Sequence, residues 1–441
     1  MKRLLPLLLC AVLALFCATT AQAAGVSITL TASEYALHYA FDAGAQDPFV
    51  ILEYATPAEK GWMMLYSEDG HFEGDVSLAY SGAGGKTSVV LTSARTTGSI
   101  GKASTTLPKA ADYQKPTGKS NAKVMDFVLT ETPEGFHYAF NAAGTDYMLL
   151  YWRSKEQTVT QPVYPDENGH YEGDVVSELT FARTQFTVQV KSGSGSMKKE
   201  ATVRKGYQAP ETPQRQEGRL SGVTVCIDAG HQENGRFVNE PIGPGLTGST
   251  SGKGGMAQGT KTNRRESIVC LEIGMLLRDE LLRQGANVIM TREDQTTFHT
   301  NIERCEIAEA GGAQIMLRLH CNNSSNRSKR GIQVYGPLNS DYAKAVADAD
   351  TYREMGQKLL DAMKTRVGMT LANSTGMVRL NDNYVGNNWA KMMCFLVEMG
   401  YLSNPAEEYL LVTPVYQQWL AEGMADGVYE IAVARGWVQA Q

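Results

Sequence analysis

The pattern of hydrophobic and polar residues changes character along the chain. Between residues 24 and 207, apolar and polar residues alternate, as in VSITL at 26–30, with glycine, aspartate and asparagine at the breaks. This alternation has a period of two and predicts short antiparallel strands. Beyond residue 220, apolar runs of strand length alternate with segments of helical period. We therefore expect a multidomain protein with an all-β N-terminal half and an α/β C-terminal half.

The β-rich half contains an internal repeat. Residues 37–42 read LHYAFD and residues 136–141 read FHYAFN, while 69–76 read DGHFEGDV and 168–175 read NGHYEGDV. His38 thus corresponds to His137, and His71 to His170, each 99 positions further along. Units of this length suit small β-sandwiches of immunoglobulin-like type. We predict one sandwich over residues 24–115 and a second over 120–207, which serve as targeting or spacing modules.

Four of the seven histidines lie in this repeat, which raises the question of a metal site. His38 and His137 fall within predicted strands, whereas His71 and His170 follow a hairpin-like Asp-Gly or Asn-Gly. Both placements are common for histidines with a structural role. The sequence alone therefore favours structural histidines over metal ligands in the repeats.

The C-terminal half is predicted to form one further domain over residues 221–438, after a proline-containing linker at 208–220. Its pattern predicts strands over 223–227, 287–290, 313–319, 332–335 and 392–397. Helices are predicted over 266–284, 301–310, 342–366 and 415–435. This order implies a central sheet flanked by helices.

The N-terminus has the features of a signal peptide. Lys2 and Arg3 precede an apolar run over 4–17, and Ala21 and Ala23 supply the small residues that signal peptidase requires. We expect cleavage after Ala23. The alternative is an uncleaved anchor, but the run is shorter than the roughly 20 residues that span a bilayer. The mature chain is thus expected to be secreted and to contain no transmembrane segment.

Charge and cysteine content narrow the function further. The formal net charge of −6 argues against non-specific binding of nucleic acid. The expected mature chain holds an odd number of cysteines, without a CxxC pair, in apolar surroundings. This is no disulfide framework, and we expect small buried side chains rather than metal ligands. These cysteines are Cys226, Cys270, Cys305, Cys321 and Cys394.

Ionisable residues stand at the predicted carboxyl ends of three strands, where the working groups of α/β sheets collect. These residues are His231, His320 and Glu398, and Glu266 opens the first long helix. Singly, each has an ordinary explanation as a turn histidine, a helix-terminal charge or a solvated acid. Together, two imidazoles and a carboxylate form a three-ligand zinc site with an open position for water. The further carboxylate could act as a general base.

Five motifs surround these residues. They read IDAGH at 227–231, RESIVCL at 265–271, MTR at 290–292, RLHCN at 318–322 and LVEMGYLSN at 396–404. In this order they resemble the zinc-dependent N-acetylmuramoyl-L-alanine amidases of the type 3 family, and the resemblance runs from about residue 223 to 433. Cys321 departs from the small residue common in relatives, and Met392 and Met393 depart from a common proline, but no ligand position is lost.

The resemblance implies a set of roles. His231, Glu266 and His320 would bind Zn²⁺, and Glu398 would be the catalytic glutamate that activates the attacking water. The implied substrate is peptidoglycan, cut between the lactyl group of N-acetylmuramic acid and the L-alanine of the stem peptide. The repeats would then hold the enzyme near its substrate through a cell-wall ligand.

The sequence does not decide the roles of the other motif residues, and it leaves two alternative functions. Arg292 and Arg304 fit structural better than catalytic roles. Asn322 is either a turn residue or a residue that steadies the His320 loop or the substrate. The alternative enzyme is a zinc peptidase that cuts within the stem peptide. A second alternative is a non-catalytic wall-binding protein with a degenerate enzyme domain.

Overall fold

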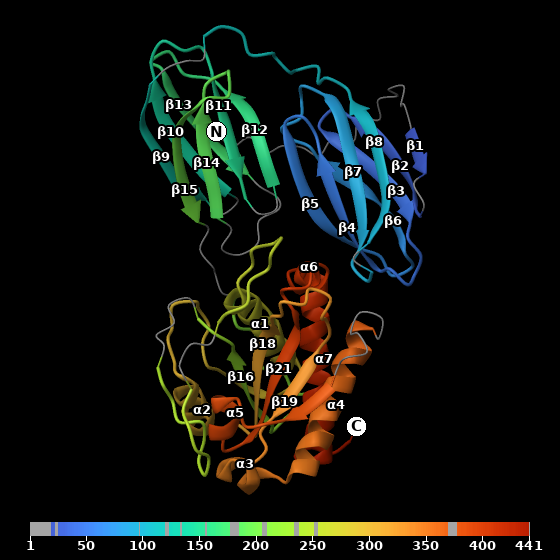
Figure 1. The fold of residues 1–441 in the computed structure, drawn as a ribbon, viewed down its shortest axis with the longest axis vertical. Coiled ribbons are helices and arrows are strands. Elements are labelled where there is room, and N and C mark those ends of the chain that lie inside the picture. Colours follow the sequence, from blue (N-terminus) through green and yellow to red (C-terminus); the bar gives the residue numbers. More distant parts are fainter. Residues whose placement is uncertain are drawn as a thin grey trace.

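The structure of the chain is a computed structural model. It describes residues 19–22, 25–96, 98–119, 123–132, 135–154, 157–176, 185–204, 210–232, 238–250, 255–368 and 377–440. The predicted signal peptide, residues 1–23, lies outside the described residues apart from 19–22. Figure 1 shows two β-rich lobes beside each other at the top, with the α/β domain beneath them.

The first repeat is built from two sheets packed face to face. One sheet contains, in order, β1 (Thr19–Gln22), which falls within the predicted signal peptide, β2 (Ser27–Ser33), β3 (Ala36–Asp42) and β6 (His71–Ser77). The other contains β5 (Glu59–Tyr66), β4 (Phe49–Ala55), β7 (Gly85–Ser93) and β8 (Ser99–Leu107). Alternate side chains of both sheets, among them Ile28, Leu37, Leu52 and Leu91, meet in one core, as the period of two predicts.

The second repeat has the same arrangement. Its smaller sheet contains β13 (His170–Val176), β10 (Gly135–Ala142) and β9 (Val124–Thr132). Its other strands are β15 (Met197–Arg204), β14 (Gln185–Lys191), β11 (Met148–Arg153) and β12 (Gln157–Val163). The core again takes residues from both layers, including Phe136, Leu150, Trp152 and Val188. The β-rich N-terminal region is thus confirmed, while the immunoglobulin-like topology stays a prediction.

The two repeats share one sheet. β12 pairs antiparallel with β5, so that the strands run continuously in the order β15-β14-β11-β12-β5-β4-β7-β8. Thr158, the second residue of β12, lies opposite Lys60, the second residue of β5. Equivalent strands therefore meet across an approximate two-fold axis. The buried carboxylate of Glu59 accepts a hydrogen bond of 3.1 Å from the Gln157 side chain, and each of these residues begins its strand.

The C-terminal domain has a six-stranded sheet. Its order is β17 (Asn287–Met290), β16 (Thr224–Ala229), β18 (Ile315–Asn322), β21 (Met393–Tyr401), β19 (Gln333–Gly336) and β20 (Met377–Leu380). The pairing is parallel except where β19 meets β21. Parallel strands with both faces covered read as continuous apolar runs, which is how β16 and β18 appear in the sequence.

Helices cover both faces of this sheet. The large core on one face forms under α1 (Glu266–Arg283), α4 (Ala349–Val367) and α7 (Pro414–Ala434). The smaller core on the other face forms beneath α2 (Asn301–Ala310) and α5 (Val385–Trp389), next to α3 (Asp341–Val346). Three of the five cysteines lie in the smaller core, and all five are buried with free thiols, as expected. The α/β fold of this domain is confirmed.

Several element boundaries differ from the sequence prediction. The helix expected over 342–366 is two helices, because Ala347 is extended and the Asp348 carboxylate caps α4 by accepting a hydrogen bond from the Thr351 amide. β18 and β21 run further than predicted. His320 and Glu398 therefore lie within strands rather than after them. The strand β20 and the short helices α5 and α6 (Glu407–Leu411) were not predicted.

The linker and the first repeat both pack against the C-terminal domain. The described part of the linker packs against α1. There the buried side chain of Arg278 donates hydrogen bonds to Thr212 and to the Pro210 carbonyl. The first repeat meets α6 and α7 through six aromatic side chains that share the large core. These are Phe49, Trp62 and Tyr66 from the repeat and Tyr409, Tyr416 and Trp419 from the helices. Among the described residues, no helix is both long and apolar enough to cross a membrane.

Candidate metal centre and active site

The turn after β16 presents the first predicted ligand. The Gly230 amide donates a hydrogen bond of 2.9 Å to the Leu319 carbonyl, which joins the turn to β18. A Cβ atom at Gly230 would lie 2.4 Å from that carbonyl oxygen, so only glycine fits. His231 follows with a φ of +58°, a left-handed conformation that is rare outside glycine. This sharp turn directs the His231 side chain toward the start of α1.

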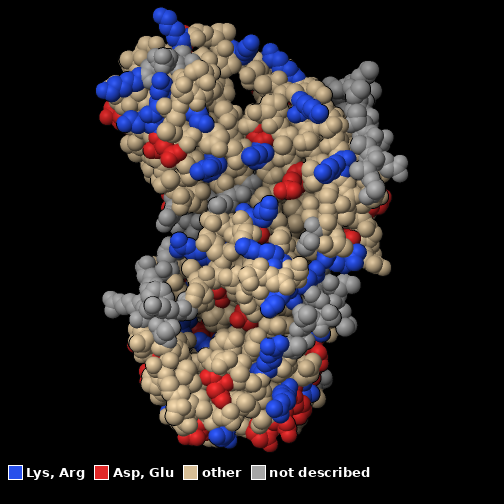
Figure 2. All heavy atoms as spheres, in the orientation of Figure 1, with Lys and Arg blue, Asp and Glu red and all other residues tan. Residues whose placement is uncertain are grey.

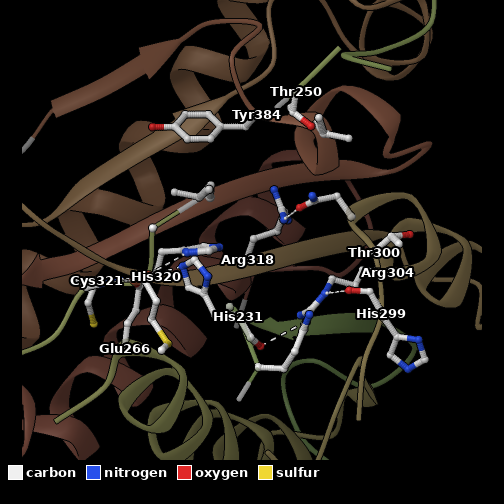
Figure 3. A pocket seen from close by; sticks show the side chains of 18 of the residues that line it. His231, Thr250, Glu266, His299, Thr300, Arg304, Arg318, His320, Cys321 and Tyr384 are labelled. Carbon is white, nitrogen blue, oxygen red and sulfur yellow. Dashed lines mark hydrogen bonds and ion pairs between the residues drawn. The ribbon is translucent and has the colours of Figure 1, made fainter. Parts of the chain in front are cut away.

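The three predicted ligands come together around Glu266. His231 Nε2 lies 3.1 Å from one Glu266 carboxylate oxygen, and His320 Nδ1 lies 2.9 Å from the other. One ligand atom from each of the three residues can be chosen so that all lie within 4.8 Å of one another. Among the described residues no other group of histidine, cysteine or acidic side chains is so close. Figure 3 shows the two imidazoles side by side above Glu266.

Two backbone amides hold the Glu266 carboxylate in place. The Ala257 amide donates to one carboxylate oxygen at 2.8 Å, and the Cys321 amide donates to the other at 3.0 Å. Burial alone would raise the pKa of Glu266, but its hydrogen bonds with the two histidines outweigh burial and keep the pKa well below its usual range. Burial lowers the pKa of His320. The centre thus favours a carboxylate beside neutral imidazole, the charge states that bind a metal.

Glu398 occupies the neighbouring strand. Its Cα is paired with that of His320 in the β18–β21 register, so both side chains belong to one row across the sheet. Burial, with a contribution from the Glu266 charge, raises the pKa of Glu398 well above its usual value. Its Oε2 atom is buried and has no hydrogen-bond partner in the described part of the chain. A buried carboxyl oxygen without a hydrogen bond destabilises the folded state. This observation suggests that a bound ligand supplies the missing partner.

All four residues line one cavity of about 930 Å³. Figure 2 shows the hollow in the lower domain, with acidic side chains inside it. Tyr384 and Thr250 lie on the opposite side of the cavity from the two histidines (Figure 3). A cavity of this size, lined by polar and apolar groups and open to solvent, lies at the upper end of the range of ligand-binding pockets.

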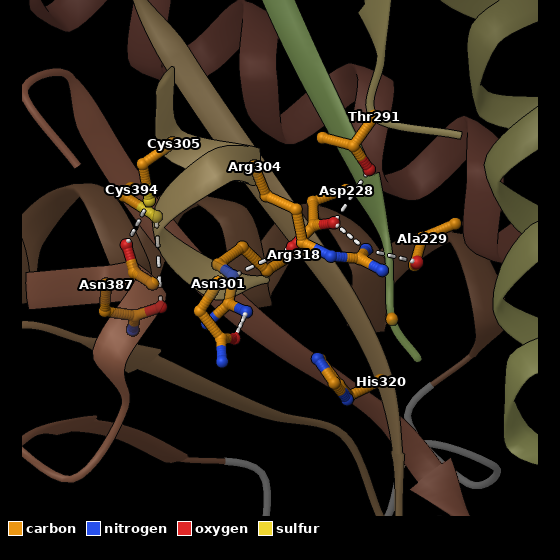
Figure 4. Close-up of polar contacts among 12 residues, drawn as sticks. Asp228, Ala229, Thr291, Asn301, Arg304, Cys305, Arg318, His320, Asn387 and Cys394 are labelled. Atoms are coloured by element: carbon orange, nitrogen blue, oxygen red, sulfur yellow. Dashed lines mark hydrogen bonds and ion pairs between the residues drawn. The ribbon is translucent and has the colours of Figure 1, made fainter. Parts of the chain in front are cut away.

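A buried ion cluster supports the floor of the site (Figure 4). Asp228, fully buried at the end of β16, pairs with Arg304 and with Arg318, the latter at 2.9 Å. Thr291 donates a further hydrogen bond of 2.8 Å. Although burial would raise the pKa of Asp228, the two guanidinium groups hold it well below its usual range. The cluster therefore stays ionised and ties β16, β18 and α2 together.

Arg292 and Arg304 also hold the His231 turn. Arg292 donates hydrogen bonds of 2.8 Å to the Ala229 carbonyl and 2.9 Å to the Gly230 carbonyl. Arg304 donates to the Ala229 and His231 carbonyls at 3.0 and 3.2 Å. Both arginines bind backbone, in keeping with the structural roles suggested by the sequence.

Sequence reasoning missed two cavity residues. Glu240, 4% exposed, accepts hydrogen bonds from the amides of Asn301 and Ile302, which begin α2. Tyr384 stands before α5, with its ring 5.1 Å from that of Tyr335. Neither follows an apolar strand, so no sequence pattern marked them. Asn322 lines the cavity and donates to the Gln333 side chain at 3.1 Å, which links β18 to β19.

The donor set fits zinc. Two imidazoles and one carboxylate are the ligands of open, catalytic zinc sites. His320 Nε2 is buried without a hydrogen-bond partner among the described residues. Its Nδ1 atom lies 2.9 Å from the Glu266 carboxylate, so the side chains of these two predicted ligands already face one another. The residues present therefore suit a divalent zinc ion, with Glu398 beside it.

Comparison with known proteins agrees with this geometry. Residues 225–430 match the family described as N-acetylmuramoyl-L-alanine amidase. A germination-specific N-acetylmuramoyl-L-alanine amidase from Bacillus subtilis is 26% identical over 231 residues, which cover 49% of this chain and 83% of the relative. The probable cell wall amidase LytH from Staphylococcus aureus is 27% identical over 235 residues, 52% of this chain and 72% of the relative.

Among solved structures, this chain is similar to an N-acetylmuramoyl-L-alanine amidase from Clostridium difficile 630. The two are 23% identical, and the match covers 48% of this chain and 96% of the other, with a TM-score of 0.38. The match to the family and the two amidase relatives carry the assignment. Residues 225–430 thus match the N-acetylmuramoyl-L-alanine amidase family, and one of the two relatives is described as a probable cell wall amidase.

Proposed function

We propose that this chain is a zinc-dependent N-acetylmuramoyl-L-alanine amidase that hydrolyses peptidoglycan outside the cytoplasm. One observation carries the proposal: His231, Glu266 and His320 converge around a single point, and the partly buried Glu398 lies next to them on the adjacent strand. The motif resemblance and the amidase relatives support the choice of substrate.

The reaction follows from these positions. When bound, zinc lowers the pKa of water to about 7 and polarises the scissile carbonyl. Glu398 accepts the proton of the attacking water and delivers it to the departing nitrogen, as a general base and then a general acid. The C–N bond between the lactyl carbonyl and L-alanine breaks, and the stem peptide leaves with a free amino terminus. A zinc ion held by His231, Glu266 and His320 would favour the ionised form of Glu398, which the base role requires.

The remaining parts of the chain fit an enzyme that works at the wall. We assign residues 1–23 to a signal peptide, so that the mature chain is secreted. We assign the two repeats to attachment, through a cell-wall ligand. If purified mature chain and isolated walls are sedimented together, the chain should pellet with the walls even after zinc has been removed by a chelator. Chain that stays in the supernatant would contradict the attachment role.

The decisive experiment is mass spectrometry of the soluble products from peptidoglycan. The purified mature chain should release intact stem peptides that begin at L-alanine. A zinc chelator should abolish this release, and added zinc should restore it. Fragments cut within the stem peptide would instead favour the zinc peptidase. Absence of any product from a chain that binds zinc would favour a wall-binding protein.

A further inference from the structure

The first repeat docks on the catalytic domain through the outer face of its larger sheet. In β4, alternate residues enter the sandwich core, while Phe49 faces outward together with Tyr66, its partner in the β4–β5 register. Both rings pack edge-on against Trp419 of α7, at 5.3 Å between ring centres in each case. The contact covers Phe49 almost completely, to 1% exposure. In this copy, the outer face is therefore a docking surface.

The second repeat has aromatic residues at the same two positions. Tyr147 lies 98 positions after Phe49, and Tyr164 lies 98 positions after Tyr66, the spacing that also relates the first residues of β12 and β5. Both tyrosines stand one residue beyond the last register pair of the β11–β12 hairpin, so they are neighbours across it. That last pair points into the sandwich core, so the two tyrosines belong to the outer face.

In the second repeat this face is open to solvent. Tyr164 is 51% exposed, and Tyr147 is partly exposed. Tyr113, from the segment that joins the two repeats, completes the group. Burial, together with the neighbouring hydroxyl groups of Tyr113 and Tyr147, raises the pKa of Tyr164. Three tyrosines from separate parts of the chain thus gather where the first repeat holds its catalytic domain.

The same face continues along the hairpin with a fourth tyrosine and with cations beside the rings. Tyr151 alternates with core residues and lies outward, as Leu149 does. Lys191 of β14, the register partner of Leu149, places its Nζ atom 3.8 Å from the centre of the Tyr151 ring. Lys109 lies 5.5 Å from the centre of the Tyr113 ring. The name tyrosine surface is used below for Tyr113, Tyr147, Tyr151 and Tyr164.

The differences between the two copies indicate the kind of partner. From the first repeat to the second, Phe49 is replaced by Tyr147, Glu53 by Tyr151, Trp62 by Thr160 and Met64 by Pro162. The second copy therefore keeps aromatic rings but gains hydroxyl groups. Hydroxyl groups buried in a dry contact with a helix are costly without partners. A sugar ring suits them, because its C–H faces stack on aromatic rings while its own hydroxyl groups bind the polar tips.

We propose that the tyrosine surface binds the polysaccharide chain of the cell wall by stacking on its sugar rings. Lys109 and Lys191, beside the rings, supply hydrogen-bond donors for the hydroxyl and carboxylate oxygens of such a chain. The inference rests on the attachment role proposed above and narrows it to one face of one repeat. The two copies thus use the same face differently, the first for the catalytic domain and the second for the glycan.

The test is calorimetric titration of the mature chain with a linear hexamer of N-acetylglucosamine. We expect saturable binding to the wild type. Tyr147→Ala/Tyr164→Ala should bind roughly 10-fold more weakly or worse, as expected when aromatic anchors are removed. Tyr147→Phe/Tyr164→Phe keeps both rings and should lose less. The control Val128→Ala, 55% exposed on the smaller sheet of the same repeat, should bind as the wild type does.

Several outcomes would overturn the proposal. These are a hexamer that does not bind, an alanine variant that binds it unchanged, and binding of a soluble stem peptide in place of the hexamer. Light scattering gives a further check, because a dimer that the alanine variant abolishes would show that a second copy of the chain occupies this face.

The hexamer separates this proposal from the amidase proposal. It contains no lactyl amide that the enzyme could cut, so binding does not depend on hydrolysis. Failure to bind the hexamer would leave the amidase proposal untouched. A chain that binds the hexamer but releases no stem peptide would contradict only the amidase proposal.

Discussion

His231 holds its backbone at a φ of +58°, a conformation that costs a non-glycine residue roughly 1–2 kcal/mol. Neighbouring side chains stabilise this unfavourable backbone conformation. Arg292 and Arg304 bind the carbonyl groups of the turn from two sides. The turn and its arginines therefore set the direction of the imidazole before any metal arrives.

Glu398 should be required for turnover but not for metal binding. Its carboxylate stands outside the group of three ligand atoms, so Glu398→Gln keeps the zinc content and loses the proton acceptor. We expect kcat to fall by roughly 10²-fold to 10⁴-fold, the usual contribution of a general base. The measurement is the rate of stem-peptide release together with bound zinc. The exposed control Glu309→Gln should change neither, and loss of zinc from Glu398→Gln would contradict the assignment.

Asp228 should be far more important for stability than any surface acid. Replacing it with asparagine leaves the buried Arg304 and Arg318 without their counter-charge, which costs roughly 3–5 kcal/mol when a buried pair is broken. Urea denaturation of Asp228→Asn measures the loss. Asp350→Asn breaks an exposed pair with Arg353 and should cost no more than about 0.5 kcal/mol. Equal effects from the two variants would contradict the role of the cluster.

The short helix α6 links three separate regions through consecutive side chains. Glu407 accepts hydrogen bonds of 2.8 Å from the Tyr401 and Gly331 amides, at the end of β21 and before β19. Glu408 accepts from the Lys261 and Thr262 amides, in the loop that leads to Glu266. Tyr409 packs against Trp62 of the first repeat. One helical turn thus connects the end of β21, the segment before β19, the loop that leads to Glu266 and the first repeat.

Glu407 should make stability depend on pH. Burial outweighs its amide hydrogen bonds and raises its pKa to about 7, from a usual value near 4.5. The folded state thus binds the proton more tightly than the unfolded state, so stability falls as pH rises between these values. The loss amounts to roughly 3 kcal/mol and is complete above about pH 7.

Glu407→Gln cannot titrate and isolates this effect. The unfolding free energy of wild type minus that of the variant should shrink by roughly 3 kcal/mol between pH 4.5 and 8. Urea denaturation at several pH values gives both quantities, and groups common to the two proteins cancel in the difference. A difference that stays constant with pH would show that the pKa of Glu407 is the same in the folded and unfolded states.

Sequence patterns predicted elements better than their ends. The strand over 287–290 and the helix over 301–310 were predicted to the residue, because the hydrophobic period and the flanking residues mark their ends. The sequence singled out His320 and Glu398 because ionisable groups stand out after apolar runs. Their places within strands were not predictable, since pairing with the neighbouring strand, through Asn322 and Tyr401, extends both strands past the apolar pattern. Glu240 and Tyr384 depend on loops that only the folded chain defines.

The first repeat and the catalytic domain should unfold together. Trp62, 7% exposed, packs edge-on against Tyr409 at 4.5 Å between ring centres, within a shared core. Trp62→Ala should cost roughly 3–5 kcal/mol and uncouple the two bodies. Calorimetry should then show separate transitions for the variant and a common one for wild type. Tyr164→Ala, at a half-exposed tyrosine of the second repeat, should leave the profile unchanged. A common transition in Trp62→Ala would contradict the coupling.

The pairing of β5 with β12 has a consequence for solubility. A lone repeat would present an unpaired edge strand, a template on which other chains add and aggregate. Here each copy covers the edge of the other, in the symmetric manner of a two-fold dimer whose protomers have been joined end to end. The connection keeps the partner edge at high local concentration, so no second molecule is needed. Each repeat thus protects the edge strand of the other from aggregation. Deletion of either repeat would leave that edge strand unpaired and prone to self-association.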